Sequence, residues 1–262
     1  MNIISVDLPW REDKKGRRTL AIADLDSNVR ITQASDDNEL LKSVRESAEP
    51  GSIILLDIPI DGCDKLDGKH FRPIDKAIAS QTLPTLPASR AGSRGKRLKA
   101  LLERDKKGFE VYEIYPYAIY KFLAYLKEKG LLWRLNINKF DTLLNEGFLT
   151  FWPRKYKREK NRQKRLENMK YLYRLLTDTN TGLNFPKPLN YPHTSSNLGQ
   201  LGDEYDACLG AIAGIHFANS SSYACIAGDS KSGNILILAD RWLVERLRSR
   251  VPVYQLSEKK YT

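Results

Sequence analysis

The chain has 262 residues, of which 41% are hydrophobic, and it carries a formal net charge of +11 at pH 7. This length and composition are sufficient for a real hydrophobic core, which indicates a globular protein rather than a disordered one. The 3 cysteines lie far apart and form no CxxC pair, so they predict neither a disulfide framework nor a zinc site. The excess of Lys and Arg favours polyanionic partners, with nucleic acid first and an anionic membrane second.

No segment predicts export or membrane insertion. The first residues, MNIISVDL, enter an apolar strand directly and lack the features of a signal peptide. The longest apolar stretch, ACLGAIAGIHFA, is shorter than the roughly 18 to 20 residues that a membrane-spanning helix requires. We therefore expect a cytoplasmic protein without a membrane partner. The sequence leaves open whether the chain forms a homodimer.

Short apolar segments and turns alternate in the first third of the chain. NIISVDL, RTLAIADL and NVRITQ are separated by a charged loop at residues 11–17 and a tight turn at residues 26–28, which predicts an antiparallel meander. In ASDDNELLKSVRESAEPGS, Ser35 or Asp36 can act as the N-cap of a helix. SIILLDIPI follows as an unbroken apolar run, typical of a strand that is covered on both faces. The ribonuclease H-like fold begins with this order of elements, and in it the buried strand is parallel to the first strand.

Further elements are predicted along the rest of the chain. They are a helix near residues 94–104, a strand in FEVYEIY, a helix in AIYKFLAYLKEKG, a basic helical segment at about residues 150–178, a loop at residues 184–202, a helix in DEYDACLGAIAGIHFA and a terminal hairpin of ACIAG and NILILA. The small residues of the last helix allow close packing on a sheet. Because we find no internal repeat and no clear linker, we predict a single elaborated α/β domain over residues 1–262.

Several acidic residues lie at the end of apolar segments or within them, where a charged carboxylate needs a partner. Asp7 and Asp57 each follow an apolar run directly, Glu113 interrupts a strand, and Asp203 and Asp206 lie three residues apart at the start of an apolar helix. An isolated ionised carboxylate is costly to bury, and several of them at one sheet edge repel one another. A divalent ion removes this conflict, and hard oxygen ligands suit Mg²⁺ or Mn²⁺. The acids therefore predict a metal-dependent enzyme that acts on phosphate.

Each acid also has a purely structural explanation. Asp7 or Asp57 could accept backbone hydrogen bonds at a strand end, and Glu113 could face solvent in an alternating strand. Asp203 could be the N-cap of its helix, with Asp206 near the positive end of the helix dipole. The prediction of a metal site fails completely only if every one of these structural explanations is correct. Two metal ions about 4 Å apart can activate water and neutralise the leaving oxygen, provided that several carboxylates hold them.

Other catalytic constellations are missing from the sequence. It contains no Walker A pattern, no GxGxxG after a strand, no GxSxG and no Cys/His pairing, so nucleotide-triphosphate hydrolysis, dinucleotide redox chemistry and serine or thiol catalysis lack support. The histidines are scattered as His70, His193 and His216. We expect His216 to be a hydrogen-bonded residue of the core or its rim, and His193 is a weak candidate for proton transfer.

The segment RKYKREKNRQKR is too charged to lie in the core. It could be a solvated helix face, or it could contact the phosphate backbone of a nucleic acid while Phe151, Trp152 and Tyr156 stack on bases. For the second interpretation the predicted contacts are seven of the cations of the segment: Lys155, Lys157, Arg158, Lys160, Arg162, Lys164 and Arg165.

Several motifs together resemble a known family. In chain order they are IISVDLPW, LLDIPI, FRPIDKAI, LPTLP, EIYP, KRLENMKYLYRLL and DEYDACLGAIAG. They resemble the domain of unknown function 429 family, which is described as predicted nucleases of ribonuclease H-like fold. The resemblance spans nearly the whole chain, although each motif is short. One departure is VDLPW, where members of the family commonly continue with a glycine-rich sequence.

The resemblance implies a set of site residues. Asp7, Asp57, Glu113 and Asp206 match the family's acidic site, with Asp203 as an additional ligand. Holliday-junction resolvases of the same superfamily are similar in having two acids three residues apart on the last helix. The resemblance also matches Arg72 and Asp75 to an Arg-containing motif, and Arg72 could then contact a phosphate.

Taken together, the sequence predicts a ribonuclease H-like domain that cleaves nucleic-acid phosphodiester bonds with Mg²⁺ or Mn²⁺. Asp7 and Asp206 are predicted to hold the metals, while Asp57 and Glu113 complete the site and orient water. The alternative is a catalytically silent nucleic-acid-binding or scaffold protein of the same fold. A kinase-like phosphotransfer enzyme is less well supported, because glycine loops that cradle phosphate are missing. The choice between DNA and RNA stays open.

Overall fold

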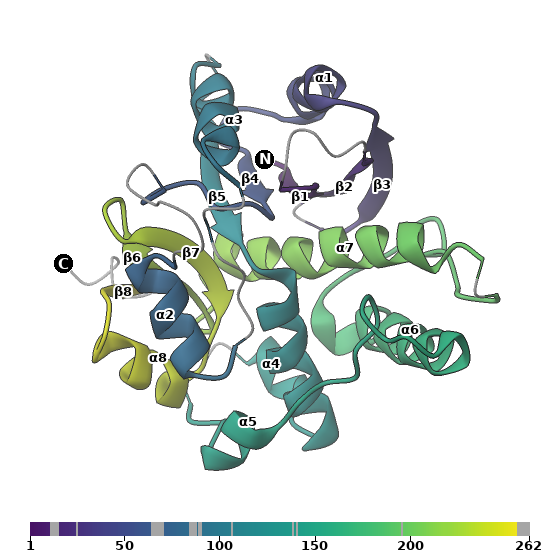
Figure 1. Ribbon diagram of the computed structural model, residues 1–262, viewed down its shortest axis with the longest axis vertical. Coiled ribbons are helices and arrows are strands. Elements are labelled where there is room, and N and C mark those ends of the chain that lie inside the picture. Colours follow the sequence, from purple (N-terminus) through teal and green to yellow (C-terminus); the bar gives the residue numbers. More distant parts are fainter. Residues whose placement is uncertain are drawn as a thin grey trace.

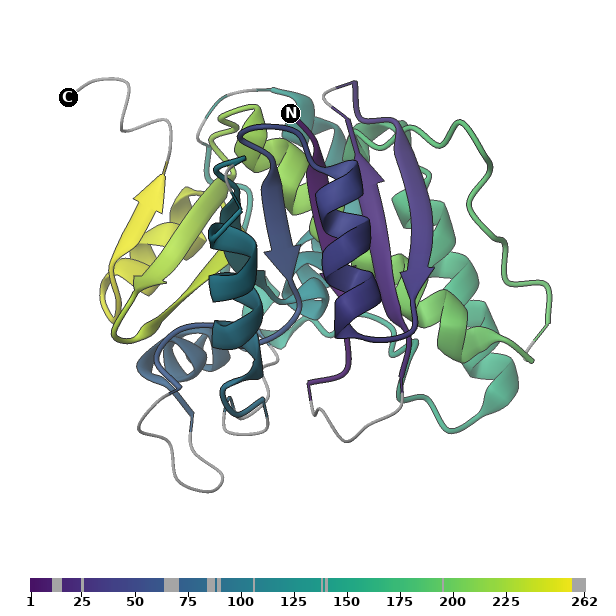
Figure 2. The ribbon, with the colours of Figure 1, turned by 90° about the horizontal axis from the view of Figure 1, so that it is seen from above.

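An eight-stranded mixed sheet flanked by helices on both faces forms the body of the molecule (Figures 1 and 2). The strand order is β3-β2-β1-β4-β5-β7-β6-β8. The computed structural model describes residues 1–10, 16–24, 26–63, 71–83, 88, 91–105, 107–137, 139, 141–194 and 196–255. The chain is an α/β protein, as the sequence predicted.

The first half of the sheet follows the predicted order of elements. Strands β1 (Ile3–Asp7), β2 (Arg18–Ala23) and β3 (Val29–Ala34) form an antiparallel meander, and β4 (Ile53–Leu56) is parallel to β1. Helix α1 (Asp37–Ser47) connects β3 to β4. Its N-cap is Asp36, whose carboxylate accepts a hydrogen bond from the Glu39 backbone N–H at 2.9 Å.

The second half extends the sheet beyond β4. Strand β5 (Glu110–Ile114) is parallel to β4 on one side and to β7 (Gly233–Leu238) on the other. Strands β6 (Ala224–Asp229) and β7 form the predicted hairpin, and β8 (Val253–Gln255) pairs with β6 in antiparallel fashion. Strand β8 was not predicted from the sequence.

Helices cover the two faces of the sheet. One long helix, α7 (Leu198–Ala218), crosses one face against β1, β2 and β4, and other helices pack on its outer side (Figure 1). Helices α1 and α3 lie on the opposite face (Figure 2). The remaining helices are α2 (Pro73–Ser80), α3 (Arg94–Glu103), α4 (Pro116–Glu128), α5 (Glu146–Thr150), α6 (Arg162–Leu176) and α8 (Arg241–Arg248), with short 3₁₀ turns η2 (Leu132–Asn136) and η3 (Thr179–Thr181). Among the described residues, no helix is both long enough and apolar enough to cross a membrane.

Two helix boundaries differ from the sequence predictions. The basic segment is helical only from Arg162, where the Asn161 side chain caps α6 by accepting from the Lys164 N–H, so residues 151–161 form an extended strap. Helix α7 begins at Leu198, inside the segment that was predicted to be a loop. The polar and glycine-containing sequence SSNLGQLG hides this start, because only its buried leucines face the core. Helix α2 was not predicted either.

Side chains of the central strands alternate between two cores. Ile3 of β1 and Leu55 of β4 belong to the core under α7, whereas Val6 and Leu56 belong to the core under α1 and α3. This alternation follows from the pleat of a strand, in which successive side chains point to opposite faces. A residue at the end of β1 or β4 therefore points toward α7 if it lies an even number of positions from Ile3 or Leu55. It points toward α1 and α3 if that number is odd.

Two glycines bring α7 close to the sheet. A Cβ atom added at Gly210 would lie 2.0 Å from Ser5 Oγ, and one added at Gly214 would lie 2.4 Å from Ile3 Cγ2. Both glycines are on the helix face that also carries Asp206, because residues four apart share a face. The prediction that small residues allow this helix to pack closely on the sheet is confirmed.

We expect Gly210→Ala to lower the free energy of unfolding by about 1–3 kcal/mol, because its methyl group overlaps β1. Gly199→Ala is the matched control in the same helix, since a Cβ there meets nothing within 4 Å. That change should be neutral or should stabilise by up to about 1 kcal/mol through helix propensity. Urea unfolding of the two variants measures the difference. Equal effects would contradict the close approach of α7 to β1.

Candidate active site

The carboxyl groups of Asp7 and Asp57 meet at the carboxyl edge of the sheet. Asp7 ends β1, and Asp57 follows the adjacent parallel strand β4 with its backbone N–H donating to the Val6 carbonyl at 3.0 Å. By pleat alternation Asp7 shares the direction of Ile3, and Asp57 that of Leu55, so both point toward α7. The two carboxyl groups lie close enough to influence each other's pKa.

This pair lies at the point where the direction of the sheet changes. From β1 the chain continues to β2 on one side, whereas from β4 it continues toward β5 on the other side. Ligands of open α/β sheets bind outside the carboxyl ends of the strands at such a switch point. The position of Asp7 and Asp57 is therefore the first place to expect a ligand.

Helix α7 contributes two further acids, and the strap contributes a cation. Lys157 Nζ lies 2.5 Å from Asp206 Oδ2, 2.9 Å from Asp203 Oδ1 and 3.4 Å from Asp7 Oδ1. We call Asp7, Asp57, Asp203 and Asp206 the acidic cluster. The structure thus brings together four of the five acids predicted as metal ligands. Asp203 is not an N-cap, because α7 begins five residues earlier.

Burial and mutual repulsion raise the pKa values of Asp7, Asp57 and Asp206. Burial raises the pKa of Asp57 to about 7, with a further contribution from Asp206. Burial also raises the pKa of Asp7 well above its ordinary value and that of Asp206 less strongly, while Lys157 opposes both shifts. Burial alone would lower the pKa of Lys157, but the surrounding carboxylates raise it well above its ordinary value. The cluster is short of positive charge even with Lys157 in place.

Tyr156 supports Asp206 from inside the protein. Its hydroxyl donates a hydrogen bond to Asp206 Oδ1, and its ring packs edge-on against Tyr120 with centroids 5.2 Å apart. Because Tyr156 is only 2% exposed, it cannot stack on a base, and that prediction was wrong. Trp152, by contrast, is 57% exposed and lies near the Lys121 ammonium. Phe151 is partly buried against the core.

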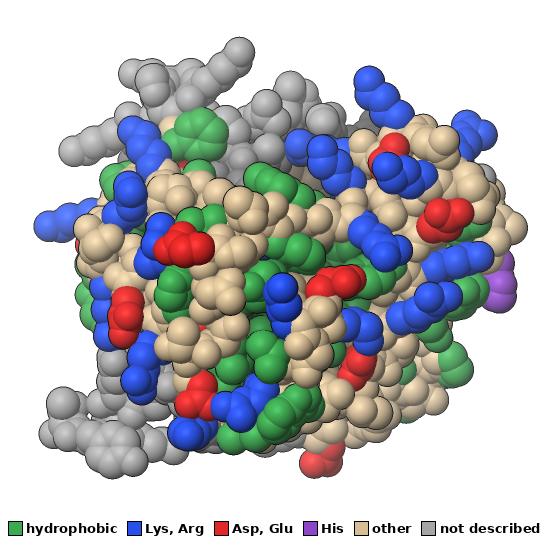
Figure 3. Space-filling model, turned by 90° about the horizontal axis from the view of Figure 1, so that it is seen from below, with side chains coloured by type: hydrophobic (Ala, Val, Ile, Leu, Met, Phe, Trp, Pro, Cys, Tyr) green, Lys and Arg blue, Asp and Glu red, His purple; other side chains and the backbone are tan. Residues whose placement is uncertain are grey.

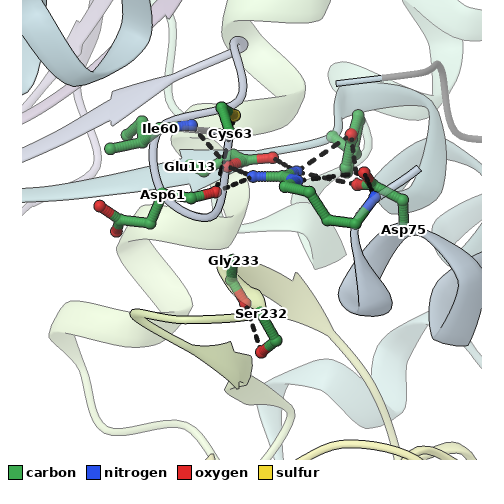
Figure 4. Close-up of polar contacts among 9 residues, drawn as sticks. Ile60, Asp61, Cys63, Asp75, Glu113, Ser232 and Gly233 are labelled. Carbon is green, nitrogen blue, oxygen red and sulfur yellow. Dashed lines mark hydrogen bonds and ion pairs between the residues drawn. The ribbon is translucent and has the colours of Figure 1, made fainter. Parts of the chain in front are cut away.

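Glu113 lies outside the acidic cluster. It pairs in register with Leu56 of β4, which faces the core on the side of α1 and α3, so its side chain points away from α7. There Arg72 donates to both Glu113 carboxylate oxygens, and the Ile60 backbone N–H donates to Oε2 at 2.9 Å. Figure 4 shows Glu113 beside Ile60 and Asp61, with Asp75 across the group from them. The charge of Glu113 still contributes to the raised pKa of Asp57, and the role of Glu113 in completing the acidic site stays a prediction.

Arg72 is enclosed within this second group of charges. Its guanidinium and backbone N–H donate to the carboxylate of Asp75, at distances of 2.8 to 3.0 Å, and Tyr115 donates to the same carboxylate at 3.0 Å. Arg72 is 0% exposed, so its position differs from the surface position that the predicted phosphate contact requires. Burial opposes the charge, but Glu113 and Asp75 raise the Arg72 pKa above its ordinary value. Burial raises the pKa of Glu113 to about 7, and Arg72 opposes this shift.

The cations of the basic segment separate into exposed and inward-facing residues. Lys157 turns toward the acidic cluster, and Arg165 donates from Nε to the Tyr156 carbonyl at 2.9 Å. The exposed cations are Arg154, Lys155, Arg158, Lys160, Arg162 and Lys164. Figure 3 shows one face of the molecule, seen from below Figure 1, on which Lys and Arg side chains are widely spread with Asp and Glu between them.

The histidines do not contribute ligands to the acidic cluster in the described part of the chain. His216 is buried in α7, where burial lowers its pKa to about 4. Its Nε2 has no hydrogen-bond partner among the described residues, so the expectation of a hydrogen-bonded imidazole was wrong for this atom. His193 is exposed with its ring against Tyr191, and His70 lies outside the described residues.

The chemistry and the geometry of the acidic cluster favour different cations. Four carboxylates are the hard oxygen ligands that Mg²⁺ and Mn²⁺ take. However, within the described residues no group of three or more His, Cys, Asp or Glu side chains is arranged to hold a metal ion. The oxygens of three acids surround Lys157 Nζ at 2.5 to 3.4 Å, whereas Mg²⁺ holds its ligands at about 2.0–2.1 Å. The carboxylates are therefore spaced for an ammonium group.

Comparisons with known proteins do not identify a relative: no protein-family model, no curated protein and no solved structure matches this chain. The interpretation of the site depends on its residues and their positions. The sequence analysis missed the inward position of Lys157. The one signal for it is Tyr156, an aromatic residue that interrupts a run of charges and marks where the strap turns toward the core.

Asp7 and Glu113 should respond in opposite ways to neutralisation. A raised pKa in the folded protein means that ionising Asp7 costs stability, and this cost grows as the pH rises from about 4 toward neutral. Without divalent metal, Asp7→Asn should therefore raise the free energy of unfolding at pH 7 by about 1–2 kcal/mol, and this gain should shrink at pH 4. Burial also raises the Glu113 pKa, but Glu113→Gln should lower the free energy of unfolding by about 3 kcal/mol, because Glu113 pairs through both oxygens with the buried Arg72, whose charge would lose that partner.

Denaturant unfolding at both pH values measures these effects. Asp36→Asn is a control on the surface, where Asn is an equally good N-cap and little change is expected. A loss of stability at pH 7 in Asp7→Asn equal to that in Glu113→Gln would contradict the separation of the two charge groups.

Proposed function

We propose that this protein is a metal-dependent nuclease of ribonuclease H-like fold that hydrolyses nucleic-acid phosphodiester bonds. The observation that carries the proposal is the meeting of Asp7, Asp57 and Asp206 from β1, the end of β4 and α7 at the switch point of the sheet. In the strand order β3-β2-β1-β4-β5, an antiparallel meander is followed by parallel strands. This order supports the ribonuclease H-like fold that was predicted from the sequence.

Asp7 and Asp57 are the residues that would hold a divalent metal ion. Mg²⁺ is commonly bound by one or two carboxylates, with water and substrate phosphate as its other ligands, so a pair of acids is a sufficient protein contribution. Such an ion would supply a more acidic bound water and would neutralise charge on the phosphate. The close approach of Asp7 and Asp57 supports this assignment, because two adjacent carboxylates repel each other and a cation between them removes that repulsion.

The other residues of the cluster orient these groups and balance their charge. Tyr156 holds one oxygen of Asp206, and Lys157 contacts the other. Lys155 and Arg158 flank Lys157 in the strap and are exposed, so a nucleic-acid backbone that contacts them is led toward the cluster. The proposed substrate path therefore runs from the basic segment to Asp7 and Asp57.

One observation favours the alternative of a catalytically silent nucleic-acid-binding protein. Lys157 already forms ion pairs with Asp7, Asp203 and Asp206. A protein of this kind would bind nucleic acid in a salt-dependent manner, without turnover and with little response to divalent metal.

The Asp7→Asn variant tests the proposed reaction. We expect Mn²⁺- or Mg²⁺-dependent cleavage of a panel of single-stranded, duplex and branched DNA and RNA by the wild type, and at least a 100-fold lower rate in the variant, since a ligand of the ion is removed. Binding should change by less than about threefold, because the basic segment is intact. Asp61→Asn is a control acid outside the cluster and should retain activity. Equal cleavage by Asp7→Asn and the wild type would reject the assignment.

Salt dependence tests the basic segment. Lys155→Glu, Lys160→Glu and Lys164→Glu together should weaken duplex binding and flatten the slope of log K against log salt by about 0.9 for each phosphate that is no longer neutralised. The matched control reverses three exposed lysines elsewhere, namely Lys42, Lys76 and Lys231. Fluorescence anisotropy at several salt concentrations gives both slopes. An unaltered slope in the first variant would remove the segment from the interface.

A further inference from the structure

The strap that carries Lys157 is fixed to the body of the protein. Each backbone carbonyl from residue 153 to residue 156 accepts a hydrogen bond from a side chain of α4 or α6. The donors are Tyr117 to Pro153 at 3.4 Å, Tyr120 to Arg154 at 3.1 Å, Asn168 to Lys155 at 2.8 Å and Arg165 to Tyr156 at 2.9 Å. The buried Tyr156 side chain adds a further anchor through Asp206. Lys157 therefore enters the cluster from a backbone that is held in place.

Three of the four carboxylate oxygens on the α7 side of the cluster already have a partner. Asp206 Oδ1 accepts from Tyr156, while Asp206 Oδ2 and Asp203 Oδ1 contact Lys157 Nζ at 2.5 and 2.9 Å. Charge-assisted bonds of this length are among the strong hydrogen bonds in proteins. A divalent ion between Asp203 and Asp206 would share the Asp206 oxygens with Tyr156 and Lys157 and would lie beside the ammonium charge.

The oxygens on the β4 side are different. Asp57 lies next to Asp7, and Lys157 Nζ lies further from Asp7, at 3.4 Å, than from the two acids of α7. The cluster thus has one end that holds an ammonium and another that holds two adjacent carboxyl groups. These two ends suit two cations of different kinds.

We propose that Lys157 is a tethered cation that takes the place of one of two metal ions in this site. On this proposal, which rests on the proposed function, the wild-type protein binds a single divalent ion at Asp7 and Asp57. The Lys157 ammonium neutralises Asp203 and Asp206, and it presents a fixed positive charge to the phosphate beside that ion.

The test is the stoichiometry of Mn²⁺ binding, measured by calorimetry and by electron paramagnetic resonance without nucleic acid. The wild type should bind one Mn²⁺ for each chain. Lys157→Met should bind two, with the magnetic coupling of neighbouring ions, or should bind one at least 10-fold more tightly, because the competing charge is gone. Lys157→Arg keeps the charge and should bind one. Lys155→Met is the matched control, since Lys155 lies two residues away on the same strap but is exposed, and it should behave as the wild type.

Each other outcome overturns a defined part of the account. Two Mn²⁺ ions in the wild type, or equal number and affinity in Lys157→Met and the wild type, would overturn the role of Lys157 and leave the proposed metal site intact. No binding to any of these proteins would overturn both. If Lys157→Met does not fold, the double variant Lys157→Met with Asp203→Asn replaces it, because this variant removes one positive and one negative charge. It should bind Mn²⁺ at least 10-fold more tightly than Asp203→Asn alone, and equal affinity would overturn the inference.

Discussion

The close contact of α7 with β1 and β4 is the constraint on which the site depends. Gly210 and Gly214 leave no room for a Cβ atom between the helix and the sheet. Asp206 lies one turn before Gly210 on the same helix face. The distance that lets the helix pack on Ser5 and Ile3 therefore also places Asp206 near the end of β1, within reach of the cation that contacts Asp7. Packing of the core and assembly of the acidic cluster have one physical cause.

Two groups of opposite charges in the described part of the protein, the acidic cluster and the group around Arg72, differ in how well they are satisfied. Every carboxylate oxygen of Glu113 and Asp75 accepts a hydrogen bond from Arg72, Tyr115 or a backbone N–H. In the acidic cluster, a single lysine forms ion pairs with three of the four aspartates, and Asp57 lies next to another acid. A fully satisfied network stabilises and rigidifies a fold. An unsatisfied one has the capacity to take a cation, which is the property that a metal-dependent site requires.

The sequence was sufficient to predict features that follow from local patterns. Apolar runs that end in an acid located Asp7 and Asp57, and the order of strands and helices predicted the first half of the sheet. Glu113 was grouped with them because it also lies in a strand near a turn. Its direction depends on the register between β4 and β5, where it lies opposite Leu56, and a strand's own sequence does not encode that register. The inward position of Lys157 depends on four hydrogen bonds to the strap from side chains of α4 and α6, three of them long-range, and no local pattern encodes these.

The most direct measurement of the central claim is an anomalous difference map from crystals soaked in Mn²⁺. The account predicts a peak within coordination distance of Asp7 and Asp57, with no peak beside Glu113 and Arg72. Loss of the peak in Asp7→Asn crystals would connect it to that carboxylate. A map without a peak at the end of β1 and β4, or with its peak at Glu113, would contradict the assignment of the acidic cluster as the metal site of a nuclease.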